Sequence, residues 1–234
     1  MLKKEIMEIL SSSKTAGWVL EPEAKRLLSL VGMDTPRFIW AKKVDQAIRF
    51  AEEIGYPVVA KVISPKILHK SEREGVVANI HSSDTLIKTF NRFSQFEEFA
   101  GMLVEEMVTG IELIVGAKVD FQFGPVILLG IGGTGVEIYR DSTLKMAPLS
   151  PRDVESMVKC LKAHQILEGY RGSKPISLVE LNRLLTTFSG LVMDLEGSIE
   201  SIDLNPVICS SEKCVVADAR IMLKKEDHLH KSWQ

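Results

Sequence analysis

The sequence predicts a mixed α/β (α+β) protein built from two lobes. In the first third of the chain, helical and strand patterns alternate, as in an α/β unit. After about residue 100, strand patterns follow one another across short turns, and two helical stretches and a hairpin come after them. We therefore expect N-terminal helices and a first lobe over residues 1–104, a second lobe over 105–226, and a frayed tail over 227–234.

The elements of the first lobe have recognisable limits. An early proline and a closing Gly32 delimit a helix in "EPEAKRLLSLVG". Amphipathic spacing predicts two more helices, and β-branched or aromatic residues predict three short strands. The helices are expected at 44–55 and 83–99, and the strands at 36–40, 57–64 and 76–81.

The second lobe begins with strand patterns separated only by Gly, Pro and Asp turns, which suggests an antiparallel meander. These patterns lie at 101–108, 111–120, 124–130 and 136–141. Two helical stretches follow at 150–164 and 177–195, and the end of the chain, 197–223, has the pattern of a β-hairpin.

Composition excludes several classes of protein. The chain has 29 Lys and Arg against 31 Asp and Glu, so it lacks the net basic field of a nucleic-acid-binding protein. No apolar run approaches the roughly 18–20 residues of a membrane span, and the N-terminus is not a signal peptide. We expect a cytoplasmic protein with reduced thiols at Cys160, Cys209 and Cys214, although a cross-strand pair between the last two would fit a hairpin.

A glycine-rich turn, "GIGGTG", matches the dinucleotide-binding spacing at Gly130, Gly132 and Gly135. That motif requires a following helix, whereas the next residues alternate like a strand, so we disfavour it. Two explanations stay open for the glycines: a tight turn between strands, or a backbone that approaches an anionic group.

Charged residues stand where the apolar pattern does not favour them. Lys61 lies inside "VVAKVI", so its ammonium must face water or pair with an anion, and nucleotide phosphates are one such anion. Glu105 and Glu106 lie at the junction of the lobes, and Glu112 follows among apolar neighbours in "IELIVG"; carboxylates there can accept from an exocyclic amine or from ribose hydroxyls. Each of these glutamates can equally be a surface residue.

The hairpin and one loop add further candidates. Asp203, Asn205 and Asp218 lie on the arms of the hairpin, and such oxygen ligands suit Mg²⁺ carried with substrate phosphates. A simple turn before Pro206 is the alternative for Asn205. His69 follows a Ser-Pro break; it is either a polar loop residue or a nucleophile that carries a phosphoryl group.

Four separated stretches together resemble a known family. They are "PVVAKVISPKILHKSEREGV", "VEEMVTGIELIVGAKVDFQFGPVILLGIGG", "VEIYRDSTLKMAPL" and "IDLNPVICSSEKCVVADARIML". In order and spacing they resemble the beta subunit of ADP-forming acetyl-CoA synthetase, an ATP-grasp family related to the succinyl-CoA synthetase beta subunit. The resemblance implies an ATP-grasp fold with nucleotide between two lobes, and a ligase that converts acyl-CoA, ADP and phosphate into acid, CoA and ATP through phosphohistidine.

The resemblance also implies a role for each matching residue. Lys61 would contact the nucleotide phosphates, with Asn205 and Asp218 as magnesium ligands. His69 would be a phosphorylated carrier, and Asp203 would face a phosphohistidine of a partner. Glu105 and Glu106 would form the hinge beside the adenine of ATP or ADP, Val108 would offer backbone contacts there, and Glu112 would bind the ribose. Two further candidates for nucleotide contact come from the glycine-rich turn, Gly132 and Gly133.

The implied partner is a CoA-binding alpha subunit, in an α2β2 heterotetramer, which handles acyl-CoA or acyl phosphate; we expect this chain to be inactive alone. The chain departs from the family after the histidine loop, where relatives typically have two glycines and this chain reads Arg73-Glu74-Gly75, and at Lys145, where arginine is usual. Two alternatives stay open: a self-sufficient ATP-grasp carboxylate ligase, and a nucleotide-sensing partner without enzymatic activity.

Overall fold

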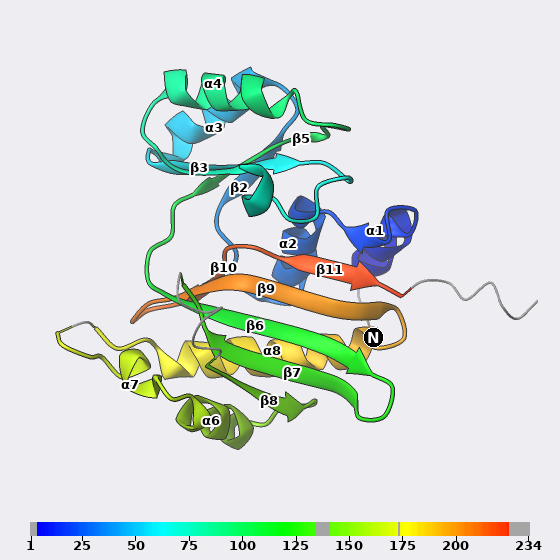
Figure 1. The fold of residues 1–234 in the computed structure, drawn as a ribbon, viewed down its shortest axis with the longest axis vertical. Coiled ribbons are helices and arrows are strands. Elements are labelled where there is room, and N and C mark those ends of the chain that lie inside the picture. Colours follow the sequence, from blue (N-terminus) through cyan, green and yellow to red (C-terminus); the bar gives the residue numbers. More distant parts are fainter. Residues whose placement is uncertain (1–3, 134–140, 173, 225–234) are drawn as a thin grey trace, which may run out of the picture.

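The computed structural model describes residues 4–133, 141–172 and 174–224, which form two antiparallel sheets one above the other (Figure 1). The four-stranded sheet has the order β2-β5-β3-β4. The seven-stranded sheet has the order β1-β11-β9-β6-β7-β8, with β10 paired to β9. Helix α2 lies between the two sheets, so its N-terminal residues can contact both.

The four-stranded sheet is covered on its outer face by two helices (Figure 1). Alternating apolar residues of the strands and the apolar stripes of the helices bury a core that includes Val58, Ala60, Leu86 and Phe93. The strands are β2 Phe38–Ala41, β3 Val58–Ile63, β4 Val76–Ile80 and β5 Gly101–Glu106, and the helices are α3 Val44–Ile54 and α4 Ser83–Phe93. A short 3₁₀ helix, Ser71–Arg73, lies in the loop between β3 and β4.

The seven-stranded sheet contains the larger core. Its strands are β1 Trp18–Val19, β6 Ile111–Asp120, β7 Gly124–Ile131, β8 Ser142–Met146, β9 Ile199–Cys209, β10 Cys214–Val216 and β11 Arg220–Leu223. The helices packed on it are α1 Lys4–Ser13, α2 Glu21–Leu30, α6 Pro151–Cys160, α7 His164–Leu167 and α8 Leu178–Leu195. Ser150 and Ser177 cap α6 and α8, because each side chain accepts from a backbone N–H of the first turn.

Three sequence-based expectations about the fold need correction. Strand β5 does not join the meander: it pairs with β2 and β3 in the other sheet, so the meander begins at β6. The predicted lobe boundary at 104/105 therefore falls inside β5, and α1 and α2 pack in the core of the second sheet. Helix α4 ends at Phe93, and most of the stretch up to residue 99 forms turns.

The cysteines also differ from expectation. Cys209 and Cys214 face each other across the β9–β10 hairpin and form a disulfide, so the prediction of reduced thiols is wrong for this pair. Cys160 is a free, exposed thiol. The predicted strand at 136–141 lies, except for Asp141, outside the described residues.

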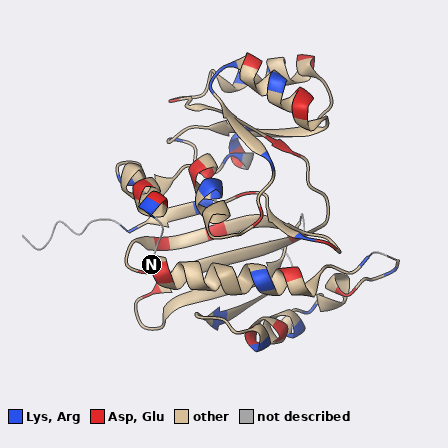
Figure 2. Ribbon diagram, turned by 180° about the vertical axis from the view of Figure 1, so that it is seen from behind, with Lys and Arg blue, Asp and Glu red and all other residues tan. Residues whose placement is uncertain are grey.

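Positions of positively and negatively charged residues are interspersed along the ribbon of both lobes, as they are along the sequence (Figure 2). Across the described ranges, no helix has both the length and the apolar character needed to cross a bilayer.

Candidate functional site

A cluster of six charged side chains lies where the two sheets meet; five of them are buried, and the sixth, Asp218, is 38 % exposed. Lys61 Nζ contacts Glu21 Oε1 at 2.8 Å and Glu105 Oε1 at 2.9 Å, and it donates to the carbonyl of Ala217 at 2.7 Å. Since Lys61 is on β3 and Ala217 directly follows β10, these contacts join the two sheets.

Helix α2 supplies the centre of this cluster. Glu21 Oε1 also contacts Lys25 at 3.0 Å, and Glu21 Oε2 accepts from Lys70. Lys25 contacts the second oxygen of Glu105 as well. With Asp218, whose Oδ1 lies 3.8 Å from Lys61 and 3.5 Å from the nitrogen of Lys70, the cluster holds three carboxylates and three ammonium groups. We call these residues the ion cluster: Glu21, Lys25, Lys61, Lys70, Glu105 and Asp218.

The charges in the ion cluster stabilise one another. Burial alone would raise the pKa of Glu21, but Lys61, Lys70 and Lys25 outweigh burial and hold that pKa well below 4.5. Desolvation would lower the pKa of Lys61, but Glu105, Glu21 and Asp218 raise it well above 10.5. Lys61 is therefore a fixed positive charge, which explains how a lysine is accommodated in an apolar strand.

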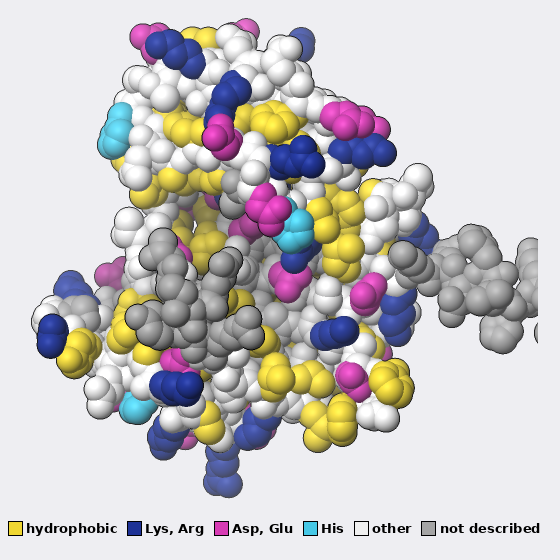
Figure 3. Space-filling model, viewed as in Figure 1, with side chains coloured by type: hydrophobic (Ala, Val, Ile, Leu, Met, Phe, Trp, Pro, Cys, Tyr) yellow, Lys and Arg dark blue, Asp and Glu magenta, His cyan; other side chains and the backbone are white. Residues whose placement is uncertain are grey.

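A cavity of about 230 Å³ adjoins the ion cluster. It gathers His69 and Lys70 from the β3–β4 loop, and Asp203, Asn205, Asp218 and Arg220 from the hairpin. Figure 3 shows basic, acidic and histidine side chains together on the face where the two lobes approach each other. The fold thus brings four of the sequence-predicted site residues into one cavity: His69, Asp203, Asn205 and Asp218.

His69 has a charged group on each side of its ring. Arg220 Nη1 lies 3.4 Å from Nε2, and Glu72 Oε1 lies 3.7 Å from Nδ1. Arg220 is itself held by Asp203, whose Oδ2 accepts from Nε at 3.2 Å and from Nη2 at 2.9 Å. Asp203 and His69 are thereby connected through one guanidinium group.

The residues predicted to contact the base and ribose are more dispersed. Both oxygens of Glu105 contact lysines and the residue is only 2 % exposed, so the carboxylate of Glu105 is part of the ion cluster in this structure. Glu106 is paired with Arg37 at 2.8 Å, and Val108 lies half-buried in the loop after β5. Glu112 is exposed on β6, and its carbonyl accepts from the N–H of Gly132 at 2.7 Å.

The glycine-rich turn is partly within the described residues. At Gly132, an added Cβ would lie 2.8 Å from the backbone carbon and oxygen of Glu112, and Gly133 has φ +96°. Both positions therefore need glycine for close backbone approach or for a left-handed conformation. Gly135 lies outside the described residues.

Asn205 and Asp218 have the chemistry of magnesium ligands. The carbonyl of Pro206 accepts from the N–H of Ala217 at 3.0 Å and from that of Asp218 at 3.4 Å, which keeps the two arms together. Desolvation and the nearby carboxylate of Glu21 raise the pKa of Asp218, so a bound cation would stabilise its ionised form. Within the described residues, no three His, Cys, Asp or Glu side chains are grouped to hold a metal by themselves; the pair fits Mg²⁺ that also binds phosphates.

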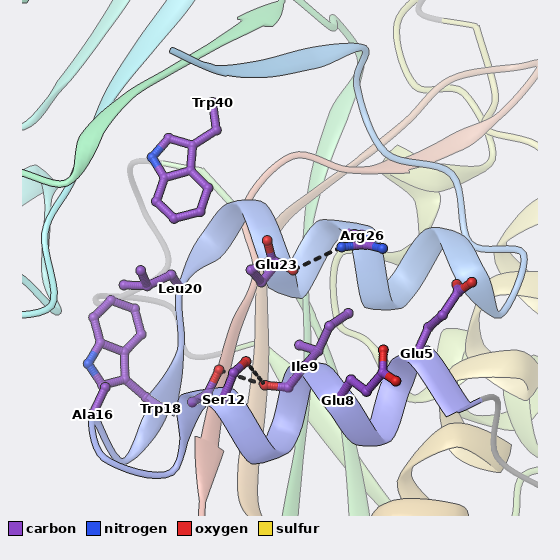
Figure 4. A pocket seen from close by; sticks show the side chains of 11 residues that line it. Glu5, Glu8, Ile9, Ser12, Ala16, Trp18, Leu20, Glu23, Arg26 and Trp40 are labelled. Carbon is purple, nitrogen blue, oxygen red and sulfur yellow. Dashed lines mark hydrogen bonds and ion pairs between the residues drawn. The ribbon is translucent and has the colours of Figure 1, made fainter. Parts of the chain in front are cut away.

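A second, larger cavity of about 460 Å³ lies between α1, α2 and Trp40 (Figure 4). Its lining has three carboxylates, Glu5, Glu8 and Glu23, one guanidinium group, Arg26, and none of the predicted site residues. The smaller cavity has as many carboxylates but two cations, Lys70 and Arg220, so the larger cavity is the poorer candidate for a polyphosphate.

Sequence reasoning missed Glu21, Lys25, Lys70 and Arg220. Glu21 and Lys25 have the i, i+4 spacing of an ordinary surface pair, and only their burial against β3 and β5 distinguishes them. Lys70 directly follows His69, and Arg220 lies two residues after Asp218, so proximity to the predicted residues was the available signal.

Residues 11–223 match the family model for an ATP-grasp domain. The chain is 40 % identical over 231 residues to the acetate–CoA ligase [ADP-forming] II subunit beta of Pyrococcus furiosus, with 94 % of this chain and 97 % of that protein covered. It is 37 % identical to the 4-hydroxybutyrate–CoA ligase [ADP-forming] of Nitrosopumilus maritimus, covering 88 % of this chain and 31 % of that one.

Solved structures show the same likeness. A chain of the dinucleotide-forming acetyl-coenzyme A synthetase 1 of Ca. Korarchaeum cryptofilum, in complex with coenzyme A, Ca-AMPCP and HgCl⁺, matches with a TM-score of 0.86 and 37 % identity, covering 93 % of this chain and 99 % of that one. This protein therefore belongs to the ATP-grasp family, within the group of ADP-forming acetate–CoA ligase beta subunits.

Proposed function

We propose that this chain is the nucleotide-binding subunit of an ADP-forming acyl-CoA synthetase, and that it exchanges a phosphoryl group between ADP/ATP and His69. One observation carries the proposal: the buried Lys61 is linked through Asp218 to a cavity that also contains His69 and Asn205. The relatives support this assignment, because several are ADP-forming ligases of acetate or 4-hydroxybutyrate.

In the proposed reaction, Lys61 binds the nucleotide phosphates in place of some of its contacts with Glu21 and Glu105. Asn205 and Asp218 would hold Mg²⁺, which supplies positive charge to the phosphate oxygens when bound. In the direction of phosphoryl transfer from ATP, a bond forms from phosphorus to an imidazole nitrogen of His69. The bond to the bridging oxygen of ADP breaks, and ADP leaves with that electron pair.

The β3–β4 loop is the proposed carrier of the phosphoryl group. The loop begins after strand β3 and ends at Gly75. The N–H of Gly75 donates to the carbonyl of Lys70 at 2.7 Å. His69 is exposed, whereas Lys70 beside it is buried in the ion cluster. A structure of the Ca. Korarchaeum cryptofilum enzyme is described with its phosphohistidine segment pointing towards the nucleotide-binding site, which supports a mobile histidine segment here.

The proposed assembly is a cytoplasmic α2β2 heterotetramer in which a CoA-binding alpha subunit handles the acyl group. Asp203, about half exposed at the cavity beside Arg220, is the proposed contact for the partner's phosphohistidine. The curated relatives of the single-chain type are about three times as long as the part that matches this chain, which is consistent with an acyl-handling part outside the ATP-grasp region.

The test is ATP synthesis from acetyl-CoA, ADP and phosphate, measured with this chain, with the CoA-binding alpha subunit, and with both. We expect ATP only from the mixture, and none when the chain carries His69→Asn or Lys61→Met. Each variant should first be shown to fold by circular dichroism. Complete turnover by the chain alone would instead favour a self-sufficient ligase, and no turnover by the mixture would refute the proposal.

A further inference from the structure

The guanidinium group of Arg220 is fixed in one orientation beside the ring of His69. Two of its nitrogens donate to a single oxygen of Asp203, at 2.9 and 3.2 Å, and its remaining nitrogen, Nη1, lies 3.4 Å from His69 Nε2. Arginine holds such a geometry because its fork of donors is planar and rigid. The free end of Arg220 therefore points at one particular nitrogen of the imidazole.

The opposite edge of the ring has a different neighbour. Glu72 is three residues after His69, in the 3₁₀ helix Ser71–Arg73, and its Oε1 lies 3.7 Å from Nδ1. A carboxylate favours a proton on the nitrogen that it faces, and an arginine, which only donates, favours a lone pair on the other. The two neighbours of the ring thus favour the tautomer with the proton on Nδ1 and the lone pair on Nε2.

The cavity beside this nitrogen has a cation and the size for a phosphoryl group. Arg220 and Lys70 both line it, and two of its three carboxylates are paired with them: Asp203 with Arg220, and Asp218 at 3.5 Å from Lys70. The third carboxylate, Glu72, faces the opposite edge of the ring. Its volume of about 230 Å³ exceeds the roughly 30 Å³ occupied by one water molecule several-fold, so a group of four or five heavy atoms fits.

We propose that His69 accepts the phosphoryl group on Nε2 and that Arg220 binds the oxygens of that group. This inference rests on the proposed role of His69 as a carrier. The Nε2 lone pair forms the bond to phosphorus, and the bond from phosphorus to the donor's leaving atom breaks, with the electron pair leaving on the donor. The proton stays on Nδ1, where Glu72 faces the positive charge of the ring, and Asp203 acts as a positioning residue for Arg220.

The experiment labels the chain with Mg²⁺ and [γ-³²P]ATP, alone and mixed with the CoA-binding alpha subunit, and stops the reaction in alkali, in which phosphohistidine survives. The peptide that contains His69 is isolated, and the phosphorylated nitrogen is identified by ³¹P NMR. We expect the label on Nε2. We expect Arg220→Met to slow labelling about 10²-fold, as for loss of one preorganised donor to a developing anion, and Arg220→Lys to restore part of the rate.

Arg92→Met is the matched control. Arg92 contacts Glu74 of the same loop at 3.3 Å but does not line the cavity, so labelling should proceed at the wild-type rate. Label on Nδ1, or a wild-type rate in Arg220→Met, would overturn the inference and leave the carrier role intact. The nitrogen assignment needs only the wild-type chain, so a poorly folded variant does not prevent the test. Absence of label at His69 both in the chain alone and in the mixture would overturn the carrier role and this inference with it.

Discussion

Replacing Glu21 by glutamine tests whether the ion cluster is a balanced unit. Glu21 is fully buried and contacts Lys25, Lys61 and Lys70 through its two oxygens. Glu21→Gln keeps the size of the side chain and removes one of three negative charges, so three ammonium groups would share two carboxylates. Breaking a buried ion pair by removing one partner costs about 3–5 kcal/mol, because the remaining charge is left buried and uncompensated.

The expected change in melting temperature follows from the length of the chain. For a protein of this size, 1 kcal/mol corresponds to roughly 2–4 °C, so Glu21→Gln should lower the melting temperature by roughly 6–20 °C. Urea unfolding should show a lower midpoint with an unchanged slope if the native state keeps its compactness. Both measurements use the purified chain without nucleotide.

Two further variants make the test specific. Asp34→Asn breaks the Arg183–Asp34 pair, which at 2.8 Å is as short as the Lys61–Glu21 pair but is about half exposed. This substitution should lower the free energy of unfolding by no more than about 1 kcal/mol. Glu21→Gln combined with Lys25→Met removes one charge of each sign and should be more stable than Glu21→Gln alone by about 0.5–3 kcal/mol. The reasoning is refuted if Glu21→Gln costs no more than Asp34→Asn, or if adding Lys25→Met gives no recovery.

Three other outcomes are expected. The pKa of Glu21 lies well below 4.5 in the folded chain, so the ionised carboxylate stabilises the fold fully above pH 4.5, and this stabilisation is lost as the pH falls. The free energy of unfolding of the wild type should therefore decrease between about pH 3 and 4.5. In Glu21→Gln that decrease should be smaller, by up to about 1.4 kcal/mol per pH unit, as measured by urea titrations at each pH. Gly132→Ala should lower the melting temperature, because its Cβ would meet the backbone of Glu112 at 2.8 Å, and an unchanged value would contradict this close approach. Asp218→Asn and Asn205→Ala should each weaken Mg²⁺-dependent ATP binding in calorimetry while leaving metal-free binding less affected, and equal losses with and without Mg²⁺ would argue against a ligand role.

The sequence was sufficient to predict most helices and strands, because their caps and periodicities are local. It did not indicate which sheet contains β5, since a strand pattern carries no record of its hydrogen-bond partners. The eight residues 101–108 resemble the following strands in composition, yet β5 pairs with β2 and β3. The sequence likewise did not predict that α1 and α2 pack against the second sheet, because an apolar helix face does not specify which sheet it covers.

The candidate site was predictable in part. The requirement that Lys61 pair with an anion is met, but the anions are Glu21, Glu105 and Asp218 of the chain itself, which only the folded structure brings together. From its sequence context, Glu105 was predicted to contact the nucleotide; in the structure its carboxylate is the counter-ion of Lys25 and Lys61. The hairpin residues were easier to predict, because neighbouring strands necessarily bring Asp203, Asn205 and Asp218 to one region.

The most direct test is a crystal structure of the chain with Mg²⁺ and a non-hydrolysable ATP analogue. We expect the phosphates within hydrogen-bonding distance of Lys61 Nζ, and the metal bound to the phosphates and to oxygens of Asn205 and Asp218. Phosphates bound elsewhere, for example in the larger cavity lined by Glu5, Glu8 and Trp40, with Lys61 still enclosed by its three carboxylates, would contradict the proposed nucleotide site.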